Sequence, residues 1–287
     1  MWYGVWPGKG WKTMKNDLIF FQKQLLLEEK APATVQKYTR AARNFARFGQ
    51  KRALSPALSL AYKRVLAQKL SPRSVNASVA ALNRFFEAVG RPDCRLKTLR
   101  WQRPAFCAEE RELSRAEYER LCRAAEQQKK PRLLLLLQAL CATGIRVGEL
   151  PFLTVEAARR GEAFVQSKGK ARTVFLVRAL RQRLLQYAAQ RGIESGPIFI
   201  TRTGKPIDRV AVWREMKALC RAAGVDERKV FPHNLRHLFA RIFYEQEKDI
   251  AKLADLLGHS SIDTTRLYII STGAEHRRKM EKMRLIL

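Results

Sequence analysis

Acidic residues, paired cysteines and long apolar runs are scarce in this 287-residue sequence. Its 26 Asp and Glu stand against 56 Lys and Arg, which gives a formal net charge of +30 and a pI near 10.6. Such an excess of positive charge predicts a polyanionic partner, and nucleic acid is the first candidate. The sequence has no acidic cluster of the kind that holds Mg²⁺, so metal-dependent hydrolysis is disfavoured, and we expect neither a metal nor a cofactor.

The five cysteines are an odd number without a CxxC pair. Neither a zinc site nor a disulfide framework is therefore indicated, and a reducing cytoplasm fits. The longest apolar run, Leu133–Leu137, is far shorter than the roughly 20 residues of a membrane-spanning helix. No apolar secretory segment opens the chain. We expect a cytoplasmic protein that does not act on membranes.

Positive charge is concentrated in an early part of the chain. Between Ala31 and Pro104 there are 16 Lys and Arg residues and two acids, Glu87 and Asp93. The basic positions are spread over helix-like segments rather than gathered in a tail. This pattern favours a folded surface that faces DNA over the alternative of a solvated cationic face. The candidate contacts are Lys37, Arg40, Arg73, Arg84, Arg100 and Arg103.

Four helix-like segments with short connections predict a small bundle over residues 14–98. The third and fourth open on a Ser-Pro pair, with proline in the first turn, where its missing N–H costs nothing. Thr34 is expected to cap the second. The segments are Asp17–Glu29, Thr34–Phe48, Ser55–Lys69 and Pro72–Val89. Residues 1–13 are either a poorly structured arm or a stretch upstream of a start at Met14, and we assign them no chemistry.

Residues 99–110 have no periodic pattern and are interpreted as a linker. The second domain, 111–287, begins with a capping box in which Ser114 is followed three residues later by Glu117. Two short β-type runs then surround a Lys-Gly-Lys-Ala turn, which is typical of a hairpin. The runs are Glu162–Ser167 and Arg172–Val177, and the expected helices are Pro131–Thr143, Arg178–Gln190, Asp208–Ala223, Asn234–Glu247, Ile250–Leu257 and Ala274–Leu287. The predicted fold is mainly α, with one small antiparallel sheet.

Arg146 follows closely on the glycine that ends a predicted apolar helix. Its guanidinium can present a planar fork to two phosphate oxygens. Glu149 lies three residues on, and on a helix it would share a face with Arg146 and hold the fork in one rotamer. The alternative is an ordinary surface ion pair, which is common and weak.

His233 and Arg236 lie three residues apart near the start of a predicted helix, so both project to one side. Arg236 is a second candidate phosphate clamp, and His233 can accept or donate a proton at neutral pH. His237 is expected to point elsewhere and to be structural. His259 follows Gly258, where the preceding helix stops, and could donate a hydrogen bond to a phosphate oxygen; the alternative is a capping or core histidine.

Lys168 lies at the tip of the predicted hairpin, from which an ammonium can enter a DNA groove and protonate a departing oxygen. Lys170 is the rival for this role and a candidate DNA contact, and its spacing from Lys168 does not decide between them. Tyr268 is the candidate nucleophile. A phenol with a pKa of about 10 needs positive charge or a base nearby to react at neutral pH. The alternative is a half-buried helical tyrosine.

Taken in order, these boxes resemble the tyrosine recombinases, also called phage-type integrases. That family has an Arg in a TGxRxxEL box, a hairpin Lys, an HxLRH box, an LGHSSxxTT box, and a Tyr nine residues after that box's His, and all five are present here. The resemblance is strong from Glu110 onward and architectural before it. Since no separate arm-binding domain precedes the four-helix part, a Xer-like or mobile-element type is expected.

The resemblance implies roles for the matching residues. Tyr268 would attack the scissile phosphate, form a 3′-phosphotyrosine and release a 5′-hydroxyl. Arg146, Arg236 and His259 would stabilise the phosphate oxygens. Lys168 would be the general acid, His233 the base or a phosphate ligand, and Glu149 a supporting acid. Neither ATP nor a metal is needed.

The resemblance also implies how the protein assembles on its substrate. A SAM-like core-binding domain and the catalytic domain would form a clamp on double-stranded DNA, within a synaptic homo-tetramer. The helix at 274–287 would dock in trans on a neighbour. Two alternatives share much of the chemistry or the fold. They are a type IB topoisomerase and a DNA-binding protein that no longer cuts.

Overall fold

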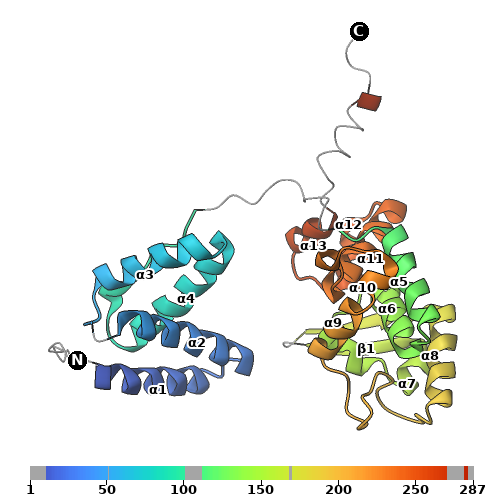
Figure 1. Cartoon of the computed structure of the whole chain (residues 1–287), viewed down its shortest axis with the longest axis horizontal. Helices are drawn as coiled ribbons and strands as arrows, with labels where there is room; N and C mark the ends of the chain where they lie inside the picture. The colour runs from blue at the N-terminus through green and yellow to red at the C-terminus, as the bar shows by residue number, and fades with distance from the viewer. Residues whose placement is uncertain (1–10, 51, 101–111, 168–169, 270–280, 284–287) are drawn as a thin grey trace. The chain divides into compact units, whose positions relative to one another are not determined.

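The structure is a computed structural model of the chain that describes residues 11–50, 52–100, 112–167, 170–269 and 281–283. Chain contacts divide it into two compact units, Met1–Arg103 and Pro104–Leu287 (Figure 1). The described residues are mostly helical, and their single sheet has two antiparallel strands. This confirms the predicted fold class.

The first unit contains a helix at each of the four predicted places, although the first begins at Trp11, six residues before the expected Asp17 and within the segment 1–13 interpreted as an arm. The helices are α1 (Trp11–Leu27), α2 (Pro32–Gly49), α3 (Pro56–Lys69) and α4 (Pro72–Ala88), followed by the short 3-10 turn η1 (Pro92–Cys94). Ser55 and Ser71 cap α3 and α4, each through its hydroxyl, which accepts a hydrogen bond from a backbone N–H of the first turn. The prediction that Thr34 caps α2 was wrong. Because Pro32 occupies the first turn, α2 begins two residues earlier and Thr34 lies inside it.

An aromatic cluster forms the core of this unit. Phe21, Phe45, Phe85 and Phe86 are fully buried, and Tyr62 is nearly so. Phe21 meets Phe85 edge-on at a centroid distance of 5.3 Å, and Phe45 meets Phe86 at the same distance. Such edge-to-face pairs add to the free energy gained from burial alone. They join α1, α2 and α4 into one body.

Two asparagines on α4 hold the chain that leaves the bundle. Asn83 donates to the carbonyl of Leu96 (2.9 Å) and accepts from its N–H (2.8 Å). Asn76, seven residues earlier, does the same with Leu99 at 2.9 and 2.7 Å. The extended segment therefore runs along α4, with its backbone groups satisfied by side chains rather than by a second strand.

The second unit begins with α5 (Arg115–Gln127), where Ser114 and Glu117 form the predicted capping box. The remaining elements are α6 (Pro131–Thr143), η3 (Val147–Phe152), α7 (Val155–Arg160), β1 (Glu162–Ser167), β2 (Lys170–Phe175), α8 (Arg178–Gln190), α9 (Arg209–Lys217), α10 (Cys220–Ala223), η4 (Glu227–Lys229), α11 (Pro232–Glu247), α12 (Ile250–Leu257) and α13 (Ile262–Ile269). Several elements differ from the prediction. The expected helix Asp208–Ala223 is divided into α9 and α10, and β2 and α11 each begin two residues early, at Lys170 and Pro232. The expected helix Ala274–Leu287 lies outside the described residues, apart from 281–283.

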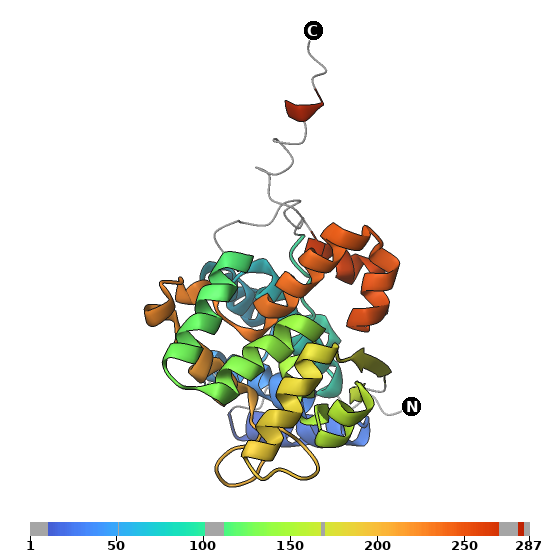
Figure 2. The same ribbon diagram turned by 90° about the vertical axis from the view of Figure 1, so that its right-hand side faces the viewer.

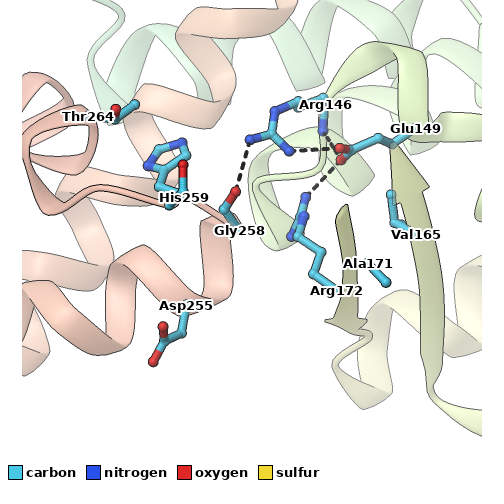
Figure 3. Close-up of a pocket in the computed structure, with 10 residues that line it drawn as sticks. Arg146, Glu149, Val165, Ala171, Arg172, Asp255, Gly258, His259 and Thr264 are labelled. Carbon is cyan, nitrogen blue, oxygen red and sulfur yellow. Dashed lines mark hydrogen bonds and ion pairs between the residues drawn. The ribbon is translucent and has the colours of Figure 1, made fainter. Parts of the chain in front are cut away.

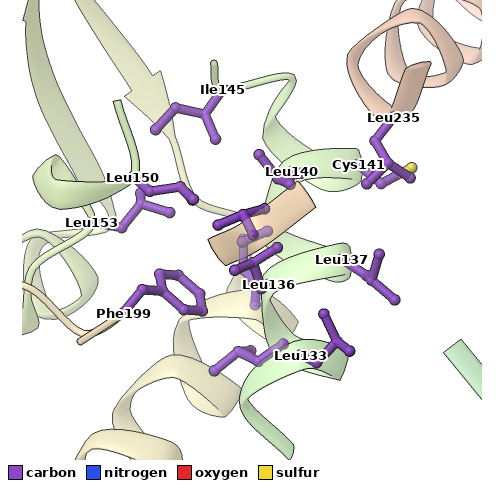
Figure 4. Close-up of a cluster of buried hydrophobic side chains, with 14 of the residues drawn as sticks. Leu133, Leu136, Leu137, Leu140, Cys141, Ile145, Leu150, Leu153, Phe199 and Leu235 are labelled. Atoms are coloured by element: carbon purple, nitrogen blue, oxygen red, sulfur yellow. The ribbon is translucent and has the colours of Figure 1, made fainter. Parts of the chain in front are cut away.

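Helix α6 is the centre of the second core. Five of its six leucines are buried and Leu134 is half-buried, in keeping with its continuous apolar sequence. Figure 4 shows Leu133, Leu136 and Leu140 along this helix, with Phe199 and Leu150 among the side chains packed around it. α6 ends at Gly144, which has a left-handed conformation. The core thereby fixes the point at which the chain turns toward Arg146.

Helices α11, α12 and α13 pack against one another beside the strand pair (Figure 2). Strand β2 also contacts α12. In the register of the hairpin, Val165 faces Arg172 and Ala163 faces Val174, and this side of the sheet is directed inward. Among the residues that the structure describes, no helix combines the length and the apolar character that crossing a membrane demands.

Candidate functional site

Arg146 is positioned by a tight turn after α6. Gly144 has φ +60°, and a Cβ at this position would lie 2.5 Å from the ring of Phe239, so the turn tolerates only glycine. Arg146 then precedes η3 and donates from Nη1 to Glu149 Oε1 at 2.8 Å. Its Nη2 makes one long contact, 3.5 Å, to the carbonyl of Gly258. The side chain is 40% exposed, which leaves this guanidinium available to a ligand.

Glu149 lies at the centre of this group and is only 2% exposed. Its carboxylate accepts from the backbone N–H of Arg146 at 3.0 Å and from Arg172 Nη2 at 2.8 Å, besides the Arg146 side chain. Burial alone would raise the pKa of Glu149. The hydrogen bonds from Arg146 and the charge of Arg172 outweigh burial and lower the pKa, so the carboxylate is ionised at neutral pH.

Arg236 is the largest fully buried side chain, at 1% exposure. Its guanidinium donates to the carbonyls of Gly144 and Leu257 and to Nε2 of His259, the last at 3.0 Å. Burial, followed by the charge of Arg146, lowers the pKa of Arg236 to about 10, so it remains a cation at pH 7. A buried cation of this kind is expensive without an anion, and no carboxylate among the described residues forms an ion pair with Arg236.

His259 is presented by Gly258, whose left-handed conformation ends α12. Because a guanidinium can only donate, Nε2 of His259 is the accepting nitrogen toward Arg236. Nδ1 then carries the proton and donates it to the hydroxyl of the buried Thr265, 2.9 Å away. Burial and the charges of Arg236 and Arg146 lower the pKa of His259 to about 4, so the ring is neutral at pH 7.

Tyr268 lies on α13 and is 7% exposed. Its hydroxyl is 3.3 Å from His233 Nε2, and its ring centroid lies 5.8 Å from Cζ of Arg236. His233 belongs to the first turn of α11 and keeps an exposed edge. Partial burial, then the charges of Arg236 and Arg146, lowers the pKa of His233. A neutral imidazole is therefore the form beside the phenol, and it can take up a proton.

The prediction that His237 points away from this group was wrong. Its ring stacks on that of Tyr268, with centroids 4.2 Å apart and planes 20° apart, and it meets His233 edge-on at 4.8 Å. His233 and His237 are four residues apart and therefore lie on the same face of α11, where the ring of Tyr268 contacts both. Burial lowers the pKa of His237 to about 3, so its ring remains neutral.

A pocket of roughly 730 Å³ opens on the cationic side of this group. Figure 3 shows Arg146, Arg172 and His259 directed toward it from η3, β2 and the turn after α12. The hydroxyls of Ser260 and Thr264 line it as well. Fixed cations with hydroxyl donors around an open cavity are suited to an anion with several oxygens.

The structure thus brings together Arg146, Glu149, His233, Arg236, His259 and Tyr268 from four separate segments. Lys168 lies outside the described residues, and Lys170 is described only in its backbone, at the first position of β2. Sequence reasoning missed Arg172. The signal for it was the alternation of β2, which places Arg172 on the same inward side as Val174.

Six of the seven predicted DNA contacts belong to the first unit, and Lys170 belongs to the second. Lys37, Arg40, Arg73 and Arg100 are exposed. Arg84 is engaged instead, because it forms ion pairs with both Glu28 and Glu87. Arg103 lies outside the described residues. In the part of the chain that is described, no three His, Cys, Asp or Glu residues gather as metal ligands would.

Comparisons with known proteins agree with this arrangement. The profile of the Phage integrase family matches residues 111–275. The chain is 30% identical over 285 residues to the tyrosine recombinase XerA of Pyrococcus furiosus, covering 96% of each protein. It is 32% identical over 277 residues to XerA of Thermococcus kodakarensis, covering 93% of this chain and 94% of the relative.

Solved structures give the same result. The crystal structure of XerA recombinase superposes with a TM-score of 0.53 at 25% identity, over 95% of this chain and 99% of that one. A lambda integrase tetramer bound to a Holliday junction superposes with a TM-score of 0.71 at 19% identity, over 91% and 77%. At that identity the second match shows the fold alone.

Proposed function

We propose, because the chain belongs to the phage integrase family of tyrosine recombinases, that it is a site-specific DNA recombinase whose nucleophile is Tyr268. The observation that supports this role most directly is the position of the Tyr268 hydroxyl, 3.3 Å from a neutral imidazole and beside a buried arginine. A phenol gains reactivity from both neighbours, since one accepts its proton and the other stabilises the phenolate.

The reaction transfers a phosphoryl group from one oxygen to another. The Tyr268 oxygen attacks the scissile phosphorus, and His233 Nε2 takes the phenolic proton. The bond from phosphorus to the 5′-oxygen breaks, and Lys168 supplies the proton that makes it a 5′-hydroxyl. The product is a 3′-phosphotyrosine, whose bond conserves the energy of the phosphodiester. A 5′-hydroxyl from the partner strand reverses the step without ATP.

Charge stabilisation in the transition state is assigned to Arg146, Arg236 and His259. Arg146 offers an exposed fork, and Arg236 a buried charge that, within the described part of the chain, no carboxylate neutralises directly. Thr265 can donate as well as accept, so it supports a His259 ring with its proton on either nitrogen. When Nε2 carries the proton, it gives up the bond that it accepts from Arg236 and can donate to a phosphate oxygen instead. Donors fixed before the reaction contribute most of such acceleration.

DNA is the substrate of this reaction, and the first unit is assigned to binding it. Residues 14–98 would act as the core-binding domain, in which Lys37, Arg40 and Arg73 contact DNA phosphates. The linker at 99–110 would contact the DNA backbone as well. We further propose a homo-tetramer in the synaptic complex, with the segment 274–287 docking in trans. The lambda integrase tetramer on a Holliday junction supports that assembly by analogy.

A covalent-adduct assay tests the function. DNA that binds the purified protein is sequenced, and a nicked suicide duplex carrying the recovered site is incubated with it. We expect a protein–DNA adduct with the wild type and none with Tyr268→Phe, at equal DNA affinity. An undiminished adduct with Tyr268→Phe would remove the enzyme assignment. Relaxation of any supercoiled plasmid without site preference would favour the topoisomerase instead.

The general acid is tested separately. Lys168→Ala is expected to slow cleavage more than Lys170→Ala does. A 5′-bridging phosphorothiolate has a leaving group that needs no proton, so it should restore cleavage by the variant that lacks the acid. Restoration of Lys170→Ala alone would reverse the assignment.

A further inference from the structure

Arg172 links three elements that carry the site. It projects inward from β2, donates from Nη1 to the carbonyl of Leu256 at 2.6 Å, and donates from Nη2 to Glu149 at 2.8 Å. The first bond reaches the last turn of α12, just before the Gly258–His259 turn, and the second reaches η3. One guanidinium thus joins the strand to the two segments that present Arg146 and His259 (Figure 3).

The stem of Arg172 is fitted closely to its surroundings. A Cβ added at Gly258 would lie 2.3 Å from Cδ of Arg172, so the left-handed glycine leaves the space through which this side chain passes. The side chain is 9% exposed, in contrast to the 40% of Arg146. A long, rotamer-rich side chain is therefore held in one conformation before DNA binds.

Direct phosphate binding by Arg172 is disfavoured by this geometry. Both of its terminal nitrogens already have partners, and its Nε is buried without one. These bonds use two of the five N–H groups of Arg172, but the side chain is only 9% exposed, so burial leaves a phosphate oxygen little access to it. Arg146 has a free edge by comparison, because its Nη2 makes only the 3.5 Å contact to Gly258.

Charge explains what Arg172 contributes. Arg146 and Glu149 alone form a neutral pair, in which the carboxylate offsets much of the positive field that Arg146 presents to a phosphate. With Arg172 sharing the same carboxylate, the trio carries a net charge of +1. Glu149 then still orients Arg146 through two hydrogen bonds.

We infer that Arg172 is a positioning residue for the reaction proposed above: it shares Glu149 with Arg146, so that Arg146 is both aligned and left positive toward the scissile phosphate. It also fixes β2 against the turn that carries His259. Arg172 acts through Glu149 and contacts neither the phosphate nor Tyr268. This inference rests on the proposed recombinase function.

The test compares two arginines of similar construction. Arg181 also donates to two backbone carbonyls, those of Ala158 and Arg159, and its guanidinium lies close to a left-handed glycine, Gly161. It lies outside the site, so Arg181→Met is a matched control for the loss of a structural arginine. We expect Arg172→Met to slow single-turnover adduct formation by about tenfold to a hundredfold, which corresponds to the free energy of one charge-assisted hydrogen bond. Arg181→Met should change this rate less than about threefold.

Three further readouts separate positioning from a general loss of structure. Arg172→Lys keeps the charge and should recover part of the rate. In a Glu149→Gln background, where no carboxylate charge remains to be shared, Arg172→Met should change the rate less than about threefold. A 5′-bridging phosphorothiolate substrate should not rescue Arg172→Met, because the defect lies in the phosphate clamp.

The possible outcomes are distinct. If wild type forms no adduct on the suicide duplex, the proposed function itself fails. If wild type reacts and Arg172→Met behaves like Arg181→Met, the function stands and the inference fails. The inference is also overturned by an undiminished effect in the Glu149→Gln background, which would show that Arg172 acts independently, or by full rescue with the phosphorothiolate.

Discussion

Replacing Gly258 by alanine is expected to damage this protein in two separable ways. Gly258 has φ +63°, a conformation that costs an L-residue about 1 kcal/mol or somewhat more. The new methyl would also lie 2.3 Å from Arg172 Cδ and 3.1 Å from its Nε. That contact is too short to persist, so the stem of Arg172 or the turn before His259 must move.

The magnitude follows from the sum of these effects. Forcing a methyl into a packed site costs about 1–3 kcal/mol, so Gly258→Ala should destabilise the second unit by about 2–4 kcal/mol in total. Gly224 is the matched control, since it has φ +58° and no atom within 4 Å of an added Cβ. Gly224→Ala should therefore lose only the backbone part, about 1 kcal/mol.

Urea denaturation followed by circular dichroism measures the free energy of unfolding of each variant. Arg172→Ala removes Cδ and with it the close contact. In the Arg172→Ala protein, Gly258→Ala should therefore lower the free energy of unfolding by only about 1 kcal/mol, which is the contribution of the backbone. Adduct formation should fall with Gly258→Ala and not with Gly224→Ala. The reasoning is refuted if Gly258→Ala is no more destabilising than Gly224→Ala, because the close approach to Arg172 would then be without consequence.

Three further predictions concern other parts of the molecule. The pKa values of His237 and His259, about 3 and about 4, lie below the ordinary 6.5. Between these values the unfolded chain binds more protons than the folded one, so the free energy of unfolding should fall as the pH is lowered from roughly 6.5 toward 4. His237→Phe keeps a ring against Tyr268 and should flatten this slope in denaturation curves taken across that range; an unchanged slope would contradict the assignment. Asn83→Ala breaks two hydrogen bonds to the backbone of Leu96 and should cost the first unit about 1–3 kcal/mol, whereas the exposed Asn44→Ala should cost almost nothing in the same melting experiment. Loss of both Lys37 and Arg40 should reduce the slope of log affinity against log salt concentration by about 0.9 for each phosphate contact removed. Arg84→Ala should reduce this slope less, because Arg84 forms ion pairs with Glu28 and Glu87.

Local signals in the sequence predicted most of the helices. Ser-Pro pairs, the Ser114–Glu117 capping box and the glycine after α6 act within one or two turns of chain, so their effect can be recognised without tertiary structure. The error at Thr34 arose where two local signals competed, and the proline at position 32 prevailed. The helix α13 that carries Tyr268 was not predicted, because half of its eight residues are β-branched (Ile262, Thr264, Thr265 and Ile269) and such residues have low helix propensity.

The residues of the site also divide into those that local sequence signals predicted and those that only tertiary contacts revealed. Arg146, Glu149, His233, Arg236, His259 and Tyr268 were predicted because each belongs to a motif with fixed spacing. His237 and Arg172 were missed as members of the site. Both act through side chains that are distant in sequence: the ring of Tyr268 is 31 residues from His237, and Glu149 is 23 from Arg172.

The sequence by itself determined the chemistry of this protein, because residue types at fixed spacings on short helices settle which groups are available and which face they share. Tertiary structure alone decided how these groups are charged and held. Burial keeps three histidines neutral, leaves Arg236 a cation with which no described carboxylate pairs, and brings one acid between two arginines. Desolvation and contact depend on what the rest of the chain packs against each group, and no local pattern of residues contains that information.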